Sequence, residues 1–291
     1  MKRLLHATVF GLLLAAALPA AAVSYLWEVS SLTNKVYLFG TVHAGMSSWY
    51  PLDHEIEHAF DNSPVLVVEA DITNADAIEK STRAMTYTPP ANLRTHIPAE
   101  DYARFRRLLD KYRIPEEAVV NMKPFMASSL LVFGEWSRLG YSPAMGVDGY
   151  LLQKAREKGK RIEELEGVDT QIALMDSLDN DETLSLFRGT LDALESGLTA
   201  EQVNGLVHAW QDGDPNALLD VARRYNDKVP GAAAFEEKFI WSRHPAMVAK
   251  ISDMLEKTRE RHFIAVGALH LAGPRGLVEL LRRKGYVVKQ L

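Results

Sequence analysis

Two histidines each follow a glycine by three positions, directly after a strand-like apolar run. The first is His43, which ends KVYLFGTVH at residues 35–43, and the second is His270, which ends HFIAVGALH at residues 262–270. In both runs the glycine permits a sharp turn at the end of the strand. If both strands lie in one parallel sheet, both imidazoles leave the same sheet edge.

The G-x-x-H spacing is weak evidence without this strand context. The chain has 18 glycines and 9 histidines among 291 residues, so chance alone predicts roughly 0.6 matches. A third match, at residues 205–208, lies in a segment whose apolar spacing is helical, and we discount it. The preceding strands are therefore what single out His43 and His270.

Two glutamates also follow predicted strands. Glu69 comes directly after the strand at residues 65–68, and Glu166 follows the strand at residues 160–165. Ligands of open parallel sheets bind beyond the carboxyl ends of the strands. Imidazoles combined with carboxylates suit Zn, Mn, Co or Fe, and a metal-bound water is a nucleophile near neutral pH.

Each of these four residues also has a plainer interpretation. A single histidine after a strand often bonds the loop backbone. Glu69 could favour the amino end of the next helix, and Glu166 could be one of several solvated carboxylates. Their common position at one predicted edge is the reason to treat them as a site.

A competing metal motif is H-E-x-x-H at residues 54–58, the pattern of zinc proteases. At about 100° per residue, His54 and His58 each lie roughly 160° around the helix from the apolar Ile56. This geometry predicts that both imidazoles face solvent. The chain contains neither a G-x-S-x-G elbow nor a phosphate-binding G-x-x-x-x-G-K-[ST] loop.

The order of elements predicts an α/β (α+β) fold. Strands at 25–31 and 36–41, a helix at 53–60 and a strand at 65–68 indicate a parallel crossover. The chain returns to alternation at its other end, with a helix at 245–259, a strand at 262–266, a helix at 274–284 and a strand at 286–291. Amphipathic helices are predicted between these ends at 75–85, 99–112, 115–139, 147–158, 170–195, 200–211, 215–225 and 235–242. We therefore predict a mostly parallel central sheet from the two chain ends, with a helical insertion at about 74–253 that carries one strand at 160–165.

Composition excludes several classes of protein. Hydrophobic residues make up 47% and charged residues 24% of the chain, as in soluble globular proteins. The absence of cysteine excludes disulfides and thiolate ligands or nucleophiles. Without Lys2 and Arg3 the chain carries 31 basic against 38 acidic side chains, a net charge of −7, so nucleic acid is not an expected partner.

The amino terminus predicts a signal peptide at residues 1–22. A basic start precedes a mostly apolar run, and small residues near Ala22 suit cleavage. An uncleaved anchor is the alternative, but the run is shorter than the ~20 apolar residues that span a bilayer, and no other stretch is long enough. We expect a periplasmic or secreted protein, a single domain at 23–291 and no stable membrane span after cleavage.

Five segments resemble the TraB/GumN family, which includes the Tiki proteins and is distantly similar to EreA-type erythromycin esterases and ChaN-like haem-binding proteins. In chain order they are LFGTVHAG, VLVVEAD, MGVDGYLLQKAREKGKRIEELEG, WSRHPAMVAKI and FIAVGALHLAGPRGLVELLRRKGYVV. The resemblance implies an EreA/ChaN-like fold. It also implies a metal-dependent site that contains His43, His270 and Glu69, with Mn or Co as the metal of Tiki proteins.

The resemblance singles out two further residues, Asp148 and Arg243. The family pairs this arginine with an asparagine, whereas the next residue here is His244. Asp148 could instead cap a helix, and Arg243 could form a structural salt bridge.

Together these features predict an exported metal-dependent hydrolase, specifically a peptidase acting on peptides or proteins with Mn, Co or Zn. Glu69, Asp148 or Glu166 would be the base, and Arg243 would stabilise the oxyanion. Trp49 and Tyr50 would line the entrance. The alternative is a non-catalytic protein that sequesters a peptide or a haem-like ligand.

Overall fold

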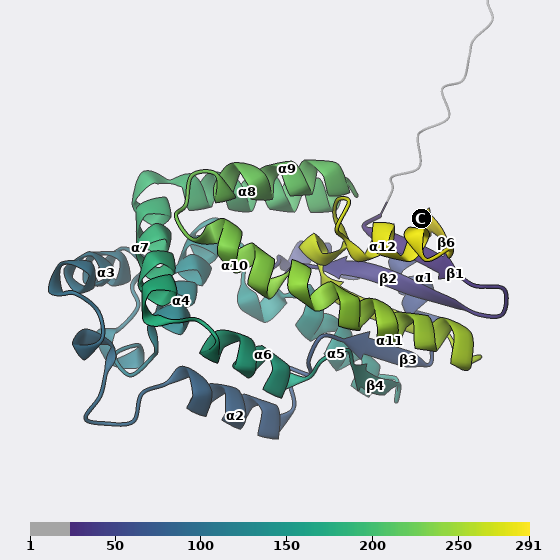
Figure 1. Cartoon of the computed structure of the whole chain (residues 1–291), viewed down its shortest axis with the longest axis horizontal. Coiled ribbons are helices and arrows are strands. Elements are labelled where there is room, and N and C mark those ends of the chain that lie inside the picture. The colour runs from purple at the N-terminus through teal and green to yellow at the C-terminus, as the bar shows by residue number, and fades with distance from the viewer. Residues whose placement is uncertain (1–23) are drawn as a thin grey trace, which may run out of the picture.

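A single six-stranded sheet organises the computed structural model, which describes residues 24–291 (Figure 1). The predicted signal peptide lies outside the described residues. The strands are β1 (Leu26–Ser30), β2 (Lys35–Thr41), β3 (Val65–Val68), β4 (Arg161–Glu164), β5 (His262–Gly267) and β6 (Val287–Gln290), in the spatial order β4-β3-β5-β2-β1-β6. The pairs β4–β3, β3–β5 and β5–β2 are parallel, whereas β1 pairs antiparallel with β2 and β6. The predicted mostly parallel sheet is confirmed.

The inner strands are apolar because helices cover them. All four residues of β3 are buried, and β5 is buried from His262 to Val266. Such continuous burial is typical of parallel strands packed between helices. Gly40 near the end of β2 has a separate role, because any side chain there would collide with the Tyr25 ring and the Ala268 backbone. The absence of a side chain at Gly40 therefore lets Tyr25 and Ala268 pack closely against the end of β2.

The helical insertion is also confirmed. The helices are α1 (His54–Asp61), α2 (Ala75–Met85), α3 (Ala99–Tyr112), α4 (Pro124–Arg138), α5 (Val147–Glu157), α6 (Val168–Asp176), α7 (Asn180–Ser196), α8 (Leu198–Gln211), α9 (Pro215–Asn226), α10 (Ala232–Phe239), α11 (His244–Lys257) and α12 (Leu277–Arg283). In Figure 1, α3, α4 and α7 gather at the end of the molecule away from the strands. These three helices share a hydrophobic core of their own, around Phe105, Leu131 and Phe187. The helices α1, α5, α11 and α12 instead contribute to the core of the sheet.

Two long predicted helices are each broken in the structure. Residues 115–139 divide into a 3-10 turn, Glu116–Ala118, and the helix α4, because the residue before Pro124 adopts an extended conformation. Residues 170–195 divide after Asp176, because Asp179 caps α7 in a reciprocal capping box with Glu182. Both predicted helices were too long because apolar residues continue at helical spacing through the positions where the structure divides them.

The predicted helix at 235–242 ends early, at Phe239. A short 3-10 turn, Trp241–Arg243, then leads directly into α11. This junction places Arg243 between two helices. Within residues 24–291, no helix is both long and apolar enough to cross a membrane.

Candidate functional site

The four side chains predicted from strand ends lie at one edge of the sheet. His43 follows β2, Glu69 follows β3, Glu166 follows β4, and His270 lies in the 3-10 turn Ala268–Leu271 after β5. Glu69 joins two of these strand ends, because its Oε1 accepts a hydrogen bond from the Gly267 amide at 2.8 Å. The same oxygen lies 3.5 Å from Nε2 of His270.

Asp148 in the first turn of α5 holds the ring of His43. Its Oδ2 lies 2.9 Å from His43 Nδ1, and its Oδ1 accepts a hydrogen bond from the Thr41 hydroxyl at 2.6 Å. Both carboxylate oxygens are therefore used across the sheet edge, and Asp148 makes no capping bond to α5. The His43 side chain remains 69% exposed. The pair thus presents an oriented imidazole to solvent.

The charge of Asp148 governs the protonation of His43. Coulombic attraction and the hydrogen bond to this carboxylate raise the pKa of His43 from 6.5 to about 9, against a smaller opposing effect of burial. At neutral pH His43 is consequently an imidazolium whose Nδ1–H is donated to Asp148. It becomes a base only after losing the proton on Nε2.

Arg243 joins the remaining members of the site. Its Nε donates to Glu166 Oε1 and Oε2 at 3.0 and 3.1 Å, and its Nη2 donates to both Glu69 and Glu166. Its Nη1 donates to the Phe239 carbonyl at 2.7 Å and to His270 Nε2 at 3.1 Å. The guanidinium is only 9% exposed, so these contacts form a largely desolvated ion cluster. Arg243 thus forms a salt bridge and also lines the candidate site, so the two interpretations of this residue are compatible.

Burial and charge set opposite ionisation states for Glu69 and His270. Burial lowers the pKa of His270 to about 3, so this imidazole is neutral at ordinary pH. Burial also disfavours the charged form of Glu69, but the positive charges of His270 and Arg243 and the Gly267 amide outweigh it and lower the pKa to about 2. Because His270 is neutral above its own low pKa, Arg243 is the charge that keeps Glu69 ionised.

The donor set does not fit a resident metal in this arrangement. In the described part of the chain, no three His, Asp or Glu side chains are grouped so as to hold a metal ion. The reason is visible in the contacts: the Arg243 guanidinium binds both Glu69 and His270 Nε2, and Asp148 binds His43. These three predicted ligands could share a metal only if Arg243 withdrew.

A cavity of about 240 Å³ opens onto these groups. Its polar wall includes His43, Glu69, Asp148 and Arg243. Its apolar wall includes Leu152 of α5, Leu174 and Met175 of α6, and Phe239 of α10. The helical insertion thus supplies most of the apolar wall. Sequence reasoning missed this wall because no local pattern shows which helix faces the sheet edge.

The two aromatic residues predicted at the entrance are placed elsewhere. Trp49 packs on Trp210 with ring centroids 5.1 Å apart and lines a separate cavity. Tyr50 stacks on Tyr150 at 4.3 Å and donates its hydroxyl to the Met145 carbonyl at 2.6 Å. Neither residue lines the cavity that contains His43 and Arg243.

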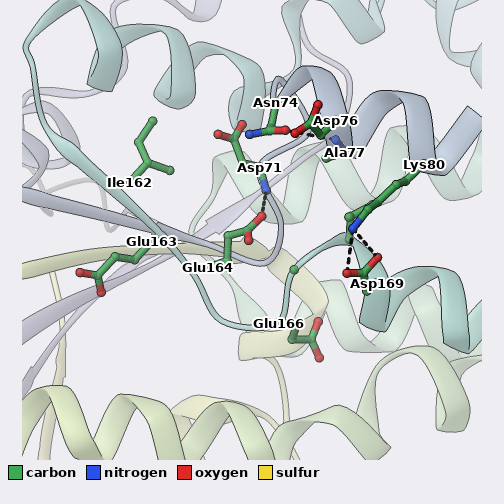
Figure 2. Close-up of a pocket in the computed structure, with 12 residues that line it drawn as sticks. Asp71, Asn74, Asp76, Ala77, Lys80, Ile162, Glu163, Glu164, Glu166 and Asp169 are labelled. Atoms are coloured by element: carbon green, nitrogen blue, oxygen red, sulfur yellow. Dashed lines mark hydrogen bonds and ion pairs between the residues drawn. The ribbon is translucent and has the colours of Figure 1, made fainter.

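A larger cavity of about 450 Å³ lies beside the site and shares Glu166 with it (Figure 2). Two carboxylates that line this cavity already have bonding partners. Asp169 forms an ion pair with Lys80 at 3.0 Å, and Glu164 accepts a hydrogen bond from the Asp71 amide at 2.6 Å. In Figure 2, the Glu166 side chain points away from Asp71. The described residues that line this cavity contain no histidine. The oriented imidazole of His43 therefore belongs to the smaller cavity.

The H-E-x-x-H motif forms a solvent-facing helix, as predicted. Ile56 and Phe60 of α1 are buried, whereas the His54 side chain is 88% exposed. The rings of His54 and His58 stack on each other at 6.0 Å. Neither His54 nor His58 lines the cavity that contains His43.

Acid should destabilise the fold through Glu69. Because its folded pKa of about 2 lies below its ordinary 4.5, its charged form stabilises the fold above pH 4.5, and this contribution is lost as pH falls toward 2. The loss is on the order of 3 kcal/mol. Urea denaturation across this range should show a smaller fall in unfolding free energy for Glu69→Gln. The matched control is Glu55→Gln on the exposed face of α1, whose pH dependence should equal that of the parent; an equal fall in all three proteins would contradict the assignment.

Comparison with known proteins agrees with the resemblance seen in the sequence. The model of the TraB/PrgY/gumN family matches residues 25–290. The uncharacterized protein YbaP of Escherichia coli K12 is 25% identical over 269 residues, which cover 89% of this chain and 93% of YbaP.

Animal metalloproteases also match across most of this chain. Metalloprotease TIKI2 of Danio rerio is 24% identical over 313 residues, and Metalloprotease TIKI1 of Xenopus tropicalis is 25% identical over 311 residues. Each alignment covers 91% of this chain but only 60% and 61% of the respective relative. No solved structure matches this chain significantly. On the family match over nearly all of its described residues, the chain belongs to the TraB/PrgY/gumN family.

Proposed function

We propose that this protein is an exported metal-dependent hydrolase, and specifically a peptidase that acts on peptides or proteins. The observation that carries the proposal is the convergence of the His43–Asp148 pair and the Arg243 cluster on one cavity at the carboxyl edge of the sheet. The names of the TIKI relatives support proteolysis and a metal. Export to the periplasm or medium is supported by the signal-like sequence at residues 1–22.

The chain's own residues supply a base and an electrophile. Neutral His43 accepts a proton from water through Nε2, and Asp148 stabilises the imidazolium that forms. Arg243 lines the same cavity, and its positive charge can stabilise an oxyanion, although its N–H groups are all bonded in this arrangement. Glu69 and Glu166 are ion-paired with this arginine, so in this arrangement they position it instead of acting as bases.

The metal in the proposal is Mn, Co or Zn, and His43, His270 and Glu69 would hold it once Arg243 has withdrawn from Glu69 and His270. His43 would then bind the metal through Nε2 and would no longer be the base, because its Nδ1 is bonded to Asp148. When bound, such a metal supplies a water of lowered pKa. The support for a metal comes from the names of the relatives, which are called metalloproteases. It does not come from the arrangement of the three side chains, which are bonded to Arg243 and Asp148.

The test compares the parent protein with a His43→Ala/His270→Ala variant. Metal content is measured by elemental analysis after mild purification, and a peptide library is incubated with added Mn, Co or Zn. We expect metal-dependent cleavage by the parent, and loss of both metal and cleavage in the variant. Equal metal content in a folded variant would contradict the ligand assignment, and no cleavage by the parent with any metal would contradict the hydrolase.

The second candidate is a non-catalytic protein that sequesters a peptide or a haem-like ligand. The full engagement of Arg243 and the apolar wall of the cavity favour it, because binding needs no free base. Such a protein should saturate at fixed stoichiometry and release unchanged ligand. Haem capture should give a Soret band that disappears in the His43 and His270 variants.

A further inference from the structure

A row of hydrogen bonds runs through two buried histidines behind the candidate site. His244 and His270 are 1% and 2% exposed, and Nε2 of His244 lies 2.9 Å from Nδ1 of His270. At one end of the row, Nδ1 of His244 lies 2.7 Å from the carbonyl oxygen of Arg275. At the other end, Nε2 of His270 lies 3.1 Å from Nη1 of Arg243.

The two ends of this row fix every proton in it. A carbonyl oxygen only accepts, so Nδ1 of His244 carries a hydrogen, and a guanidinium only donates, so Nε2 of His270 carries none. A neutral imidazole has one N–H, which leaves Nε2 of His244 as an acceptor and Nδ1 of His270 as a donor. All three bonds are then satisfied with both rings neutral.

We infer that His244 is a positioning residue that, together with Arg243, holds His270 in its Nδ1–H tautomer, with the lone pair of Nε2 accepting from Arg243. Partners behind a functional imidazole commonly fix its tautomer and ring orientation in this way. The consequence for hydrolysis rests on the proposed function, whereas the consequence for the His270 tautomer does not.

The anchor of the row is itself held in place. The Arg275 guanidinium pairs with the Glu237 carboxylate through two bonds of 2.5 and 2.7 Å and lies over the Trp241 ring at 5.5 Å. The same indole packs against the His244 ring in a T-shaped arrangement, with centroids 5.3 Å apart and planes at 85°. His244 is thus constrained by packing as well as by its two hydrogen bonds.

Two amide substitutions separate the two bonds of His244. In His244→Gln, the longer side chain places its amide near the position of Nε2, where it can accept from His270. In His244→Asn, the shorter side chain places its amide near the position of Nδ1, where it can donate to Arg275 but does not reach His270. His244→Leu makes neither bond.

Nitrogen NMR of protein labelled with ¹⁵N-histidine reads the tautomer directly. We expect His270 to have a pyridine-like Nε2 in the parent and in His244→Gln. In His244→Asn and His244→Leu, we expect the Nε2–H tautomer to appear. A His270 that stays entirely in the Nδ1–H form in the folded Asn and Leu variants would overturn the inference, because Arg243 alone would then set the tautomer.

Peptide hydrolysis provides the second readout. We expect kcat to fall about 10- to 100-fold in His244→Asn with KM little changed, and His244→Gln to retain kcat within about threefold. Equal losses in the two amide variants would contradict a role through His270. Absence of turnover in the parent would contradict the proposed function alone, since the NMR comparison still decides the role of His244.

Discussion

Replacing His43 by alanine is expected to lower kcat for peptide cleavage by about 10²- to 10⁴-fold, the usual contribution of a positioned general base. Its ring is oriented by Asp148, which is held in turn by Thr41, and it faces the cavity with most of its surface exposed. Because the side chain is largely exposed, losing its ion pair with Asp148 should lower the unfolding free energy by only about 1 kcal/mol or less. Steady-state kinetics on a cleaved library peptide, with thermal denaturation in parallel, measures both effects.

The pH profile distinguishes a base from a residue that only fills space. Because Asp148 raises the pKa of His43 to about 9, activity of the parent should rise with pH through this value. Asp148→Asn removes the charge, so the rising limb should move down toward the ordinary 6.5. The matched control is His54→Ala, which removes an exposed imidazole from α1 and should change neither rate nor profile. A rising limb that does not move in Asp148→Asn would contradict the base assignment.

Strand ends were the part of this site that sequence alone could locate. The runs before His43 and His270 are short, apolar and bounded by breakers, so both strands and their turns were predictable. Glu69 and Glu166 followed from the same reasoning, because parallel strands end at one edge. Nothing local, however, reveals that β5 pairs between β2 and β3. Parallel pairing depends on contacts between distant segments, here the two chain ends.

The other half of the site comes from helix ends, where local patterns are weakest. Asp148 resembles an ordinary helix-starting residue, and Arg243 lies in the short gap between the helices predicted at 235–242 and 245–259. Only the family resemblance singled them out. The apolar wall formed by Leu174, Met175 and Phe239 was not found at all, because its placement depends on how the insertion folds back over the sheet. The spacing of apolar residues along a helix shows which of its faces is buried, but not which other helix or strand packs against that face.

Replacing Arg243 by methionine is expected to destabilise the fold by about 3–5 kcal/mol, the usual cost of leaving a buried charge without its partner. The guanidinium is bonded to Glu69, Glu166 and His270 and is almost fully buried. Methionine retains much of the volume but none of the five donors, so two carboxylates remain buried without a countercharge. Urea denaturation at about neutral pH measures the loss in unfolding free energy, which is expected to be large there because Glu69, with its pKa of about 2, is ionised.

Two further variants identify the origin of that loss. Glu166→Gln in the Arg243→Met background removes one unpaired charge and should recover part of the stability, whereas the same substitution in the parent should destabilise it. Arg243→Lys keeps the charge but cannot form the forked bonds, so its stability should be intermediate. If the unfolding free energy of Arg243→Met lies within about 1 kcal/mol of that of the parent, the cluster is not the buried ion network described here.

The same variant tests whether the arginine occupies the place of a metal. Without Arg243, the carboxylate of Glu69 and Nε2 of His270 lose their donor, so with His43 they become free to coordinate a cation. Added Mn, Co or Zn should then raise the unfolding free energy of Arg243→Met more than that of the parent, because a ligand stabilises the state that binds it. The effect should disappear in Arg243→Met/His270→Ala. Equal stabilisation of variant and parent would mean that Arg243 and a metal do not compete, and the ligands would have to be sought outside this cluster.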